Sequence, residues 1–248
     1  MLLRSITKHL KEQNWFAVFL DLFIVVVGVF IGIQVANWNE SKKEKTEFDH
    51  SLSRLQEEIV TNTTNLKQLG INLQDRLTRV NDAIEILRAC EDSDENQQKV
   101  SREVATISGT IGIHIENTVL FEITETPHLS QQLSQQVKKD LEKLKTIAQF
   151  ILSEAKFSEE LPLRNLVPEN PIVLHGELIE KTSKFYGIEI TDKTRRLYIE
   201  EPVSAACKNT DLLNSFDTWQ IWQEQQHANI TTLHQAFENA SLHVENGQ

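Results

Sequence analysis

The stretch FAVFLDLFIVVVGVFIGIQVAN, residues 16–37, decides how this chain is built. Fifteen of its 22 residues are Leu, Ile, Val or Phe. As a helix it spans about 33 Å, enough to cross a hydrocarbon core of about 30 Å. The apolar residues favour insertion by about 5 to 9 kcal/mol in total, whereas Asp21 costs at most about 3.5 kcal/mol on the same scale. Trp15 and Trp38 flank the stretch at the two positions expected for an aromatic belt. It therefore predicts a transmembrane helix over residues 16–37.

A cleaved signal peptide is the alternative reading of this segment. Its apolar region is usually only about 7 to 15 residues long, and cleavage follows a triplet with small residues at its first and third positions. The nearest such triplet, Gln34-Val35-Ala36, lacks the small first residue. A retained anchor is therefore favoured. It divides the chain into a short N-terminal tail (1–15), the membrane helix (16–37) and a long domain (38–248).

The charges on the two sides of the anchor do not set its orientation. Three basic residues lie close to each end, so the positive-inside rule gives a tie. They are Arg4, Lys8 and Lys11 before the anchor, and Lys42, Lys43 and Lys45 after it. Both cysteines, Cys90 and Cys207, lie on the long side, where a disulfide would suit an oxidising periplasm and two unpaired buried thiols are the alternative. We expect a cytoplasmic tail and a periplasmic domain, held at the bacterial inner membrane.

Small residues recur every four positions in the anchor, at Gly28, Gly32 and Ala36. This spacing lets two membrane helices approach closely, so the pattern favours self-association or contact with another membrane protein. Asp21 lies seven residues before Gly28 and falls on nearly the same face, where its carboxyl could bond a polar group of the partner. The alternatives are that Asp21 reaches headgroups or water, and that the glycines only reflect their frequency in membrane helices.

The run from Asp21 to Glu40, DLFIVVVGVFIGIQVANWNE, resembles a bacterial family of single-pass membrane proteins of unassigned function. In that family an acidic residue opens a Val/Ile-rich anchor, which closes on a Gln-x-x-Asn-Trp-Asn-Glu box. Asp21 stands where the family more often has Glu, and the resemblance ends soon after the box. It implies a membrane-anchored, largely helical protein and supplies no activity. The box residues here are Gln34, Asn37, Trp38, Asn39 and Glu40.

The domain after the anchor is acidic and poor in turn residues. Residues 39–248 carry 34 Asp or Glu against 22 Lys or Arg without a basic stripe, so nucleic acid is not an expected partner. The whole chain holds only 8 Gly and 5 Pro, which speaks against a β-sandwich or barrel and favours long helices.

An apolar stripe with heptad-like steps is the clearest periodic signal in this domain. It predicts a helix over about 40–91 that must bury one face against other helices. Asn62 is its one polar member, which either sets the register of partner helices or leaves a solvated gap. The stripe consists of Phe48, Leu52, Leu55, Ile59, Asn62, Leu66, Leu69, Leu73, Leu77, Val80, Ile84 and Leu87.

Further helices are expected over about 97–125, 127–159, 174–200 and 210–242. In the first of these, Ile111, Ile113 and Ile115 alternate as in a strand, but helix is favoured. The segment 174–200 reads as one helix or two short ones, with a small hairpin around Asp192-Lys193 as the alternative. The expected fold is all-α: one N-terminal transmembrane helix followed by an elongated antiparallel helical bundle with coiled-coil-like heptads.

The sequence offers little catalytic chemistry. Two Glu-x-x-His pairs, Glu47 with His50 and Glu224 with His227, match half of a di-iron site but lie off the apolar stripes. Neither a nucleophile elbow nor a phosphate-binding glycine loop occurs. Trp219 and Trp222 either line a ligand pocket or belong to the core, and the core is favoured. We expect no metal and no cofactor.

These patterns predict a non-enzymatic, membrane-anchored scaffold or interaction protein. Its expected partners are membrane lipid and either a second copy of the chain or another membrane protein. The alternative is a periplasmic ligand-sensing bundle that signals through a membrane partner, and a membrane-bound enzyme ranks third.

Overall fold

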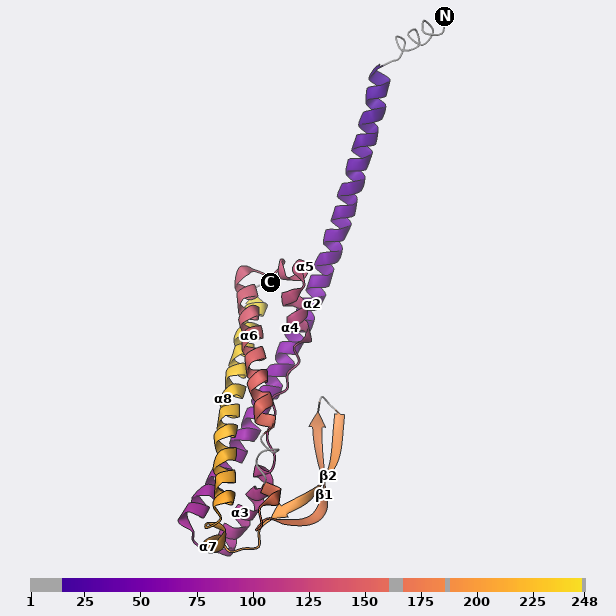
Figure 1. Cartoon of the computed structure of the whole chain (residues 1–248). Coiled ribbons are helices and arrows are strands. Elements are labelled where there is room, and N and C mark those ends of the chain that lie inside the picture. Colours follow the sequence, from indigo (N-terminus) through magenta and orange to yellow (C-terminus); the bar gives the residue numbers. More distant parts are fainter. Residues whose placement is uncertain (1–14, 161–166, 186–187, 247–248) are drawn as a thin grey trace, which may run out of the picture. The chain divides into compact units, whose positions relative to one another are not determined.

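The computed structural model describes residues 15–160, 167–185 and 188–246, so most of the predicted tail (1–15) lies outside the described residues. The described chain is mostly helical with one small sheet (Figure 1). Its elements in order are α2 (Trp15–Ala89), α3 (Asp94–Ile107), α4 (Thr118–Glu125), α5 (Pro127–Ser130), α6 (Gln135–Glu159), the short 3-10 helix η2 (Val167–Glu169), β1 (Leu174–Phe185), β2 (Ile188–Tyr198), α7 (Val203–Ala206) and α8 (Thr210–Asn246).

Helix α2 contains both the apolar segment and the heptad-like stripe. The chain divides within this helix into two compact units, Met1–Ser53 and Arg54–Gln248. In the second unit the stripe is the buried face of α2, with Leu55, Leu73 and Val80 fully covered and only Leu69 half-buried. This burial contributes about 1.5 to 3 kcal/mol per large side chain. Asn62 is buried as well, so it is not a solvated gap.

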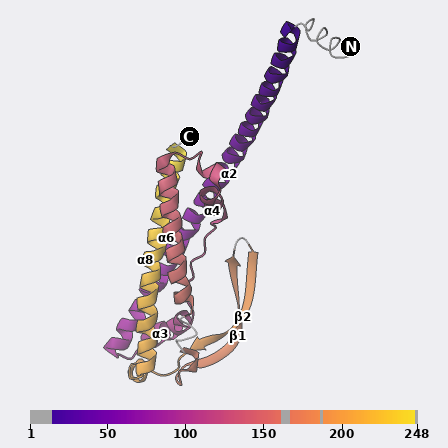
Figure 2. The same ribbon diagram turned by 45° about the horizontal axis from the view of Figure 1, so that its top comes forward.

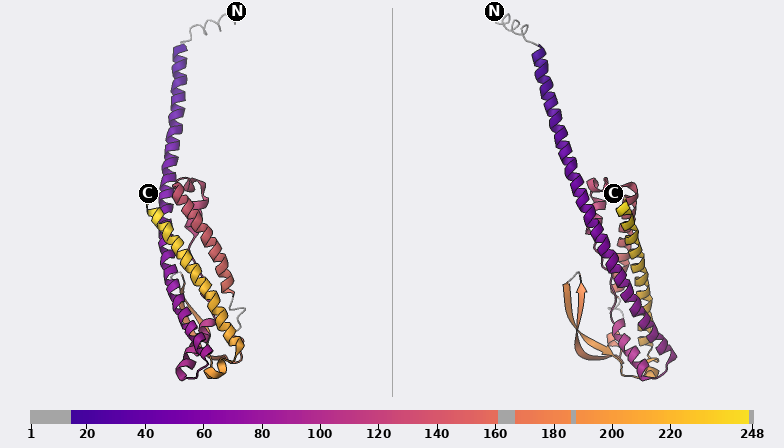
Figure 3. Two further views of the ribbon diagram at one scale, coloured as in Figure 1. Left: turned by 90° about the vertical axis from the view of Figure 1, so that its left-hand side faces the viewer. Right: turned by 180° about the vertical axis from the view of Figure 1, so that it is seen from behind.

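The second unit is built around α2, α6 and α8. Helices α6 and α8 pack together, and Figures 2 and 3 show them side by side. Helix α8 also contacts α2, where Arg88 pairs with Asp217 at 3.3 Å and Gln220 donates to Asn81 at 3.0 Å. The core residues of α6 recur at helical spacing, and the fully buried Phe216 and Phe237 of α8 supply its largest side chains.

Residues 97–125 do not form one helix, so that prediction was wrong. Helix α3 ends at Ile107, the chain then runs without regular structure to Asn117, and α4 begins at Thr118. Ile111 and Ile113 are buried, which explains their strand-like alternation, although no strand forms there. The predicted helix over 127–159 is likewise interrupted. Helix α5 ends at Ser130, and α6 begins after Ser134, whose hydroxyl accepts from Val137 N–H at 3.3 Å.

The segment 174–200 is a β-hairpin, which corrects the prediction of a helix and of an all-α fold. Strands β1 and β2 pair antiparallel from Leu174↔Tyr198 to Phe185↔Ile188, with an irregularity between His175 and Leu178. The alternative hairpin around Asp192-Lys193 is also wrong, because both residues lie within β2 and pair with Lys181 and Glu180. Strand β2 is rich in β-branched and aromatic residues, which suit strands.

The base of the hairpin is joined to α3 (Figure 1). Directly after β2, the Ile199 carbonyl accepts from Gln97 at 2.7 Å, and the Ile199 N–H donates to the Ser101 hydroxyl at 3.1 Å. Ile199 and Leu197 are buried, whereas Leu178 is 59% exposed farther along the ribbon. The hairpin is therefore anchored to α3 at its base.

Candidate membrane anchor and interaction surfaces

The first unit presents an apolar helix that nothing else in the described chain covers. One helix near the N-terminus is long and apolar enough to cross a membrane, and none of its apolar window is buried inside the protein. Phe19, Val26 and Ile31 are each more than half exposed. Soluble proteins rarely leave an apolar surface of this extent in water. By length, composition and exposure, the segment is suited to lipid.

Gly28, Gly32 and Ala36 lie on one face of this helix because residues four apart are neighbours on a helix surface. A Cβ added at either glycine would meet no atom within 4 Å outside its own helix. The backbone is therefore open along this face. The Asp21 side chain lies outside the described residues, so only the position of Asp21 in α2 is defined.

The residues of the Gln-x-x-Asn-Trp-Asn-Glu box continue α2 without a break, and all five are exposed. The Trp38 ring is 67% exposed, and Lys42 Nζ lies 5.7 Å from its centre. A cation over an exposed indole contributes about 0.5 to 1 kcal/mol. An amphipathic ring beside a basic residue is the arrangement expected where a membrane helix leaves the lipid.

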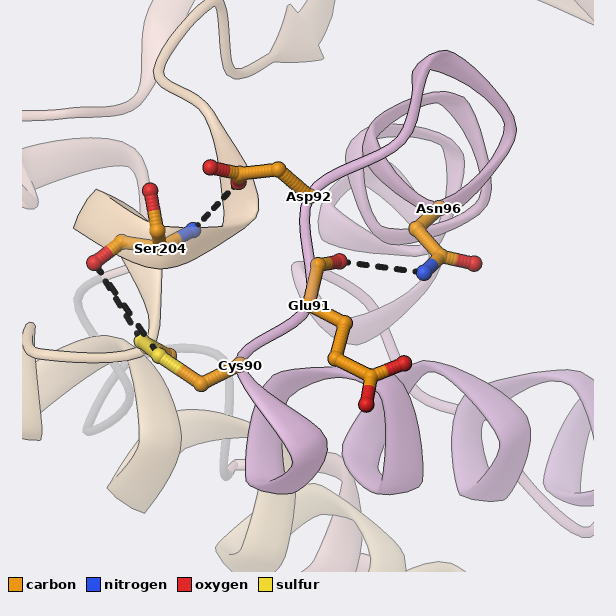
Figure 4. Close-up of a disulfide and its surroundings, with 6 residues drawn as sticks. Cys90, Glu91, Asp92, Asn96 and Ser204 are labelled. Atoms are coloured by element: carbon orange, nitrogen blue, oxygen red, sulfur yellow. Dashed lines mark hydrogen bonds between the residues drawn. A yellow bond between two sulfur atoms is a disulfide. The ribbon is translucent and has the colours of Figure 1, made fainter.

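Cys90 and Cys207 form a disulfide in the second unit, with their Cα atoms 5.6 Å apart and a sequence separation of 117 residues (Figure 4). Cys90 directly follows the last residue of α2 and has φ 57°, the left-handed conformation common just after a helix. Its N–H donates to the Ile86 carbonyl at 3.0 Å. The disulfide thus joins the end of α2 to the residue that follows α7.

The turn after Cys90 is held to α7 by a second contact. Asp92 Oδ1 accepts from the Ser204 N–H at 2.7 Å, as Figure 4 shows. This bond satisfies a backbone donor in the first turn of α7, whose N-cap residue, Pro202, offers no side-chain acceptor. The hydrogen bonds to Ser204 lower the pKa of Asp92. Across the turn, Ser93 caps α3 by accepting from Asn96 N–H at 3.0 Å.

A buried acid that the sequence did not single out lies beside Asn62 on α2. Glu58 is only 5% exposed, and its two carboxylate oxygens accept from the N–H groups of Val119 and Leu120 at 2.8 and 2.9 Å. Asn62 donates to the Glu116 carbonyl at 2.6 Å and accepts from the Glu116 N–H at 2.9 Å. We call Glu58 and Asn62 the polar clamp.

The polar clamp supplies the hydrogen-bond acceptors for the first N–H groups of α4. The N-cap residue of α4, Asn117, makes no side-chain capping bond, and the Glu58 carboxylate takes that role from a neighbouring helix. Burial raises the pKa of Glu58, and the two N–H donors oppose that rise. The sequence does show an acid and an amide four residues apart on α2, Glu58 and Asn62. Their role as hydrogen-bond acceptors and donors becomes clear only from the position of α4 in the structure.

Polar residues of α8 hold the other end of the same irregular segment. Trp219 Nε1 donates to the Gly109 carbonyl at 2.6 Å, and Gln223 Oε1 accepts from the Ile111 N–H at 3.2 Å. Gln226 Nε2 lies 3.5 Å from the Ile111 carbonyl oxygen. Trp219 is only 2% exposed, so it belongs to the core, as the sequence favoured.

The two Glu-x-x-His pairs belong to different units, Glu47 with His50 to the first and Glu224 with His227 to the second. Within residues 15–160, 167–185 and 188–246, no group of three His, Cys, Asp or Glu side chains is placed to hold a metal ion. Glu47 and His50 are exposed on α2, and Glu224 is exposed on α8.

Comparison with known proteins adds no relative to these observations. No family model matches the chain, and neither a curated protein nor a solved structure matches it. The resemblance of the anchor to a bacterial family stays a prediction.

Proposed function

We propose that this protein is a non-enzymatic, membrane-anchored interaction module. Residues 16–37 cross the bacterial inner membrane, the tail lies in the cytoplasm, and the acidic domain forms an elongated antiparallel helical bundle in the periplasm. Partner contact runs through the face of Gly28, Gly32 and Ala36. The observation that carries this proposal is the uncovered apolar helix, with its backbone open at both glycines.

The glycine face suits a helix partner because apolar side chains alone do not drive association in lipid. Close backbone approach and van der Waals packing do, and small residues four apart permit both. A second copy of the chain is the proposed partner. The heptad-like stripe does not take part in this self-association, because Leu55, Leu66 and Leu77 are already buried within the protomer.

The periplasmic placement is supported by the disulfide. Disulfides persist in oxidising compartments and are rare in the cytosol of mesophiles. The Cys90–Cys207 bond lies in the second unit, on the long side of the anchor. Reporter fusions at the C-terminus test this placement: periplasmic activity is expected, and cytoplasmic activity would overturn it.

Self-association is tested by chemical crosslinking of the full chain in its native membranes. Gly28→Ile and Gly32→Ile place branched side chains where the backbones would meet, so the crosslinked dimer should fall to the level of a monomeric control. Phe30→Ile is the matched variant, because it lies on the opposite side of the helix at 100° per residue. An unchanged dimer in both glycine variants, or equal loss in Phe30→Ile, would remove this face from the proposal.

A further inference from the structure

A groove of about 600 Å³ lies between α2 and α8 in the second unit. Its floor is apolar: Leu66 and Ile230 are buried, and Gly70 contributes no side chain. A Cβ at Gly70 would lie 3.5 Å from Ile230 Cγ2. Because Gly70 has no side chain, the groove is deeper at the point where the two helices meet. Ile71, 56% exposed, adds apolar surface at the rim. Both volume and lining are typical of sites for small amphiphilic molecules.

The ionisable residues of the groove fall into two groups. Asp75 is paired with Arg79, and His234 Nδ1 lies 3.5 Å from Glu238 Oε2, so each of these has a partner within the protein. Lys67 and His227 also line the groove, and their side chains have no hydrogen-bond or ion-pair partner among the described residues. The groove therefore carries an uncompensated cation, Lys67, in a protein with a formal charge of −11. An apolar floor beside a free ammonium group selects an anion with a hydrocarbon body.

We propose that this groove binds an amphiphilic carboxylate of the fatty-acid class. Its hydrocarbon body lies on Leu66, Gly70, Ile71 and Ile230, and its carboxylate pairs with Lys67. From Lys67 to Thr78 the groove follows α2 for about 16 Å, which accommodates an extended medium-length alkyl chain. This function is independent of the proposed contact between membrane helices, since all residues of the groove belong to the second unit.

A neighbouring groove provides an internal comparison. It has about 540 Å³, lies farther along the same two helices, and is lined by Val60, Thr64, Leu242 and the acid Glu238 but by no basic residue. Volume and apolar surface are similar in the two grooves, whereas the free cation is present in only one. A carboxylate should therefore prefer the groove at Lys67.

The test uses the full chain in phosphatidylcholine nanodiscs and a photoactivatable diazirine derivative of dodecanoate, with labelled peptides mapped by mass spectrometry. Labels are expected on residues 66–78 of α2 and 227–234 of α8. Labels on the membrane helix report the probe dissolved in lipid and serve as an internal standard. Lys67→Gln should lower groove labelling about fivefold relative to that standard, and the neutral diazirine dodecanol should label the groove weakly.

Matched substitutions inside and outside the groove distinguish an effect on binding from an effect on folding. Ile71→Ser removes exposed apolar surface from the groove, and Ile221→Ser makes the same change on α8 outside it. Lys139→Gln on α6 is the matched charge control. Only the groove variants should reduce labelling. Equal labelling of both grooves, or no effect of Lys67→Gln, would overturn the proposal. Dimer crosslinks from a benzophenone residue at position 71 would do so too, because a second copy would then cover the groove.

Discussion

Glu58 and Asn62 lie one turn apart on α2 and bind four backbone groups in the segment 116–120, none of them in a neighbouring turn of their own helix. The polar clamp thus replaces the hydrogen bonds that a regular helix or sheet would provide for this stretch. Buried backbone groups without partners are costly, so an irregular segment packed against a core requires such side chains. Arg54, one turn before Glu58, extends the same face by pairing with Glu122 at 3.1 Å.

Asn62→Ala should destabilise the second unit by about 1 to 3 kcal/mol, because it removes two hydrogen bonds. The substitution takes away the partner of both the N–H and the carbonyl of Glu116, in a contact that is partly buried. The free energy of unfolding is measured by denaturant titration of the full chain in detergent. Asn72→Ala is the control, because Asn72 is exposed and its side-chain oxygen accepts from Gln68 at 3.0 Å. A loss no larger than that of Asn72→Ala would show that the clamp does not stabilise the segment.

Glu58 should make the protein less stable as the pH rises. Its pKa in the folded protein lies above its ordinary value of 4.5, so the folded state binds the proton more tightly than the unfolded chain does. Its contribution to stability is therefore complete below 4.5 and decreases as the pH rises through the raised pKa. The free energy of unfolding is measured from low to neutral pH for the native chain and for Glu58→Gln. The stability of the native chain relative to Glu58→Gln should decrease as the pH rises.

Asp92 should show the opposite pH dependence of stability to Glu58. Its pKa is lowered from 3.8, so its contribution to stability is present above that value and is lost as the pH falls. The difference between the native chain and Asp92→Asn should therefore shrink on acidification. The same trend for Asp92 and Glu58 would show that one of the two side chains is not held as described.

Removal of the disulfide should cost about 4 to 5 kcal/mol, because the bond closes a loop of more than one hundred residues in the unfolded chain. The double variant Cys90→Ser/Cys207→Ser is compared with the oxidised protein by thermal unfolding, and the reduced native chain is the control for the substitutions. Equal stability of oxidised and reduced protein would contradict a structural role for the bond.

Gly70→Ala should stabilise the second unit by about 0.5 to 1 kcal/mol. Gly70 lies inside α2, where alanine is the better helix former, and the added Cβ would meet Ile230 at an ordinary contact distance. Gly70→Leu is the comparison, because a larger side chain would press against Ile230 and should destabilise the protein. Both are measured by denaturant titration, and destabilisation by alanine would mean that α2 and α8 lie closer than described.

The regular helices were largely predictable, whereas their connections were not. The stripe from Leu55 to Leu87 indicated its helix because one long periodic face must be buried. The hairpin was not predicted because Leu178, Ile179 and Ile190 lie on an exposed ribbon. Without a buried face, the strands show no clear alternation of apolar and polar residues. Long-range pairing of Leu174 with Tyr198 overrode a weak helical pattern.

Polar residues on the buried faces of α2 and α8 show what apolar periodicity alone does not predict. Asn62, Gln223 and Gln226 are polar, yet each lies at the core and contacts the backbone of residues 109–117. Periodicity identifies a buried position, but it does not tell whether the neighbour is a side chain or an irregular backbone. The same holds for Glu58, whose partners are 61 and 62 positions away.

The covalent link between Cys90 and Cys207 turns everything from α3 to α7 into a closed ring. A protease that cut once inside this ring would leave both fragments attached, and α8 would stay tethered to the end of α2. Nicks in the exposed hairpin would thus go unnoticed on a gel run without a reducing agent.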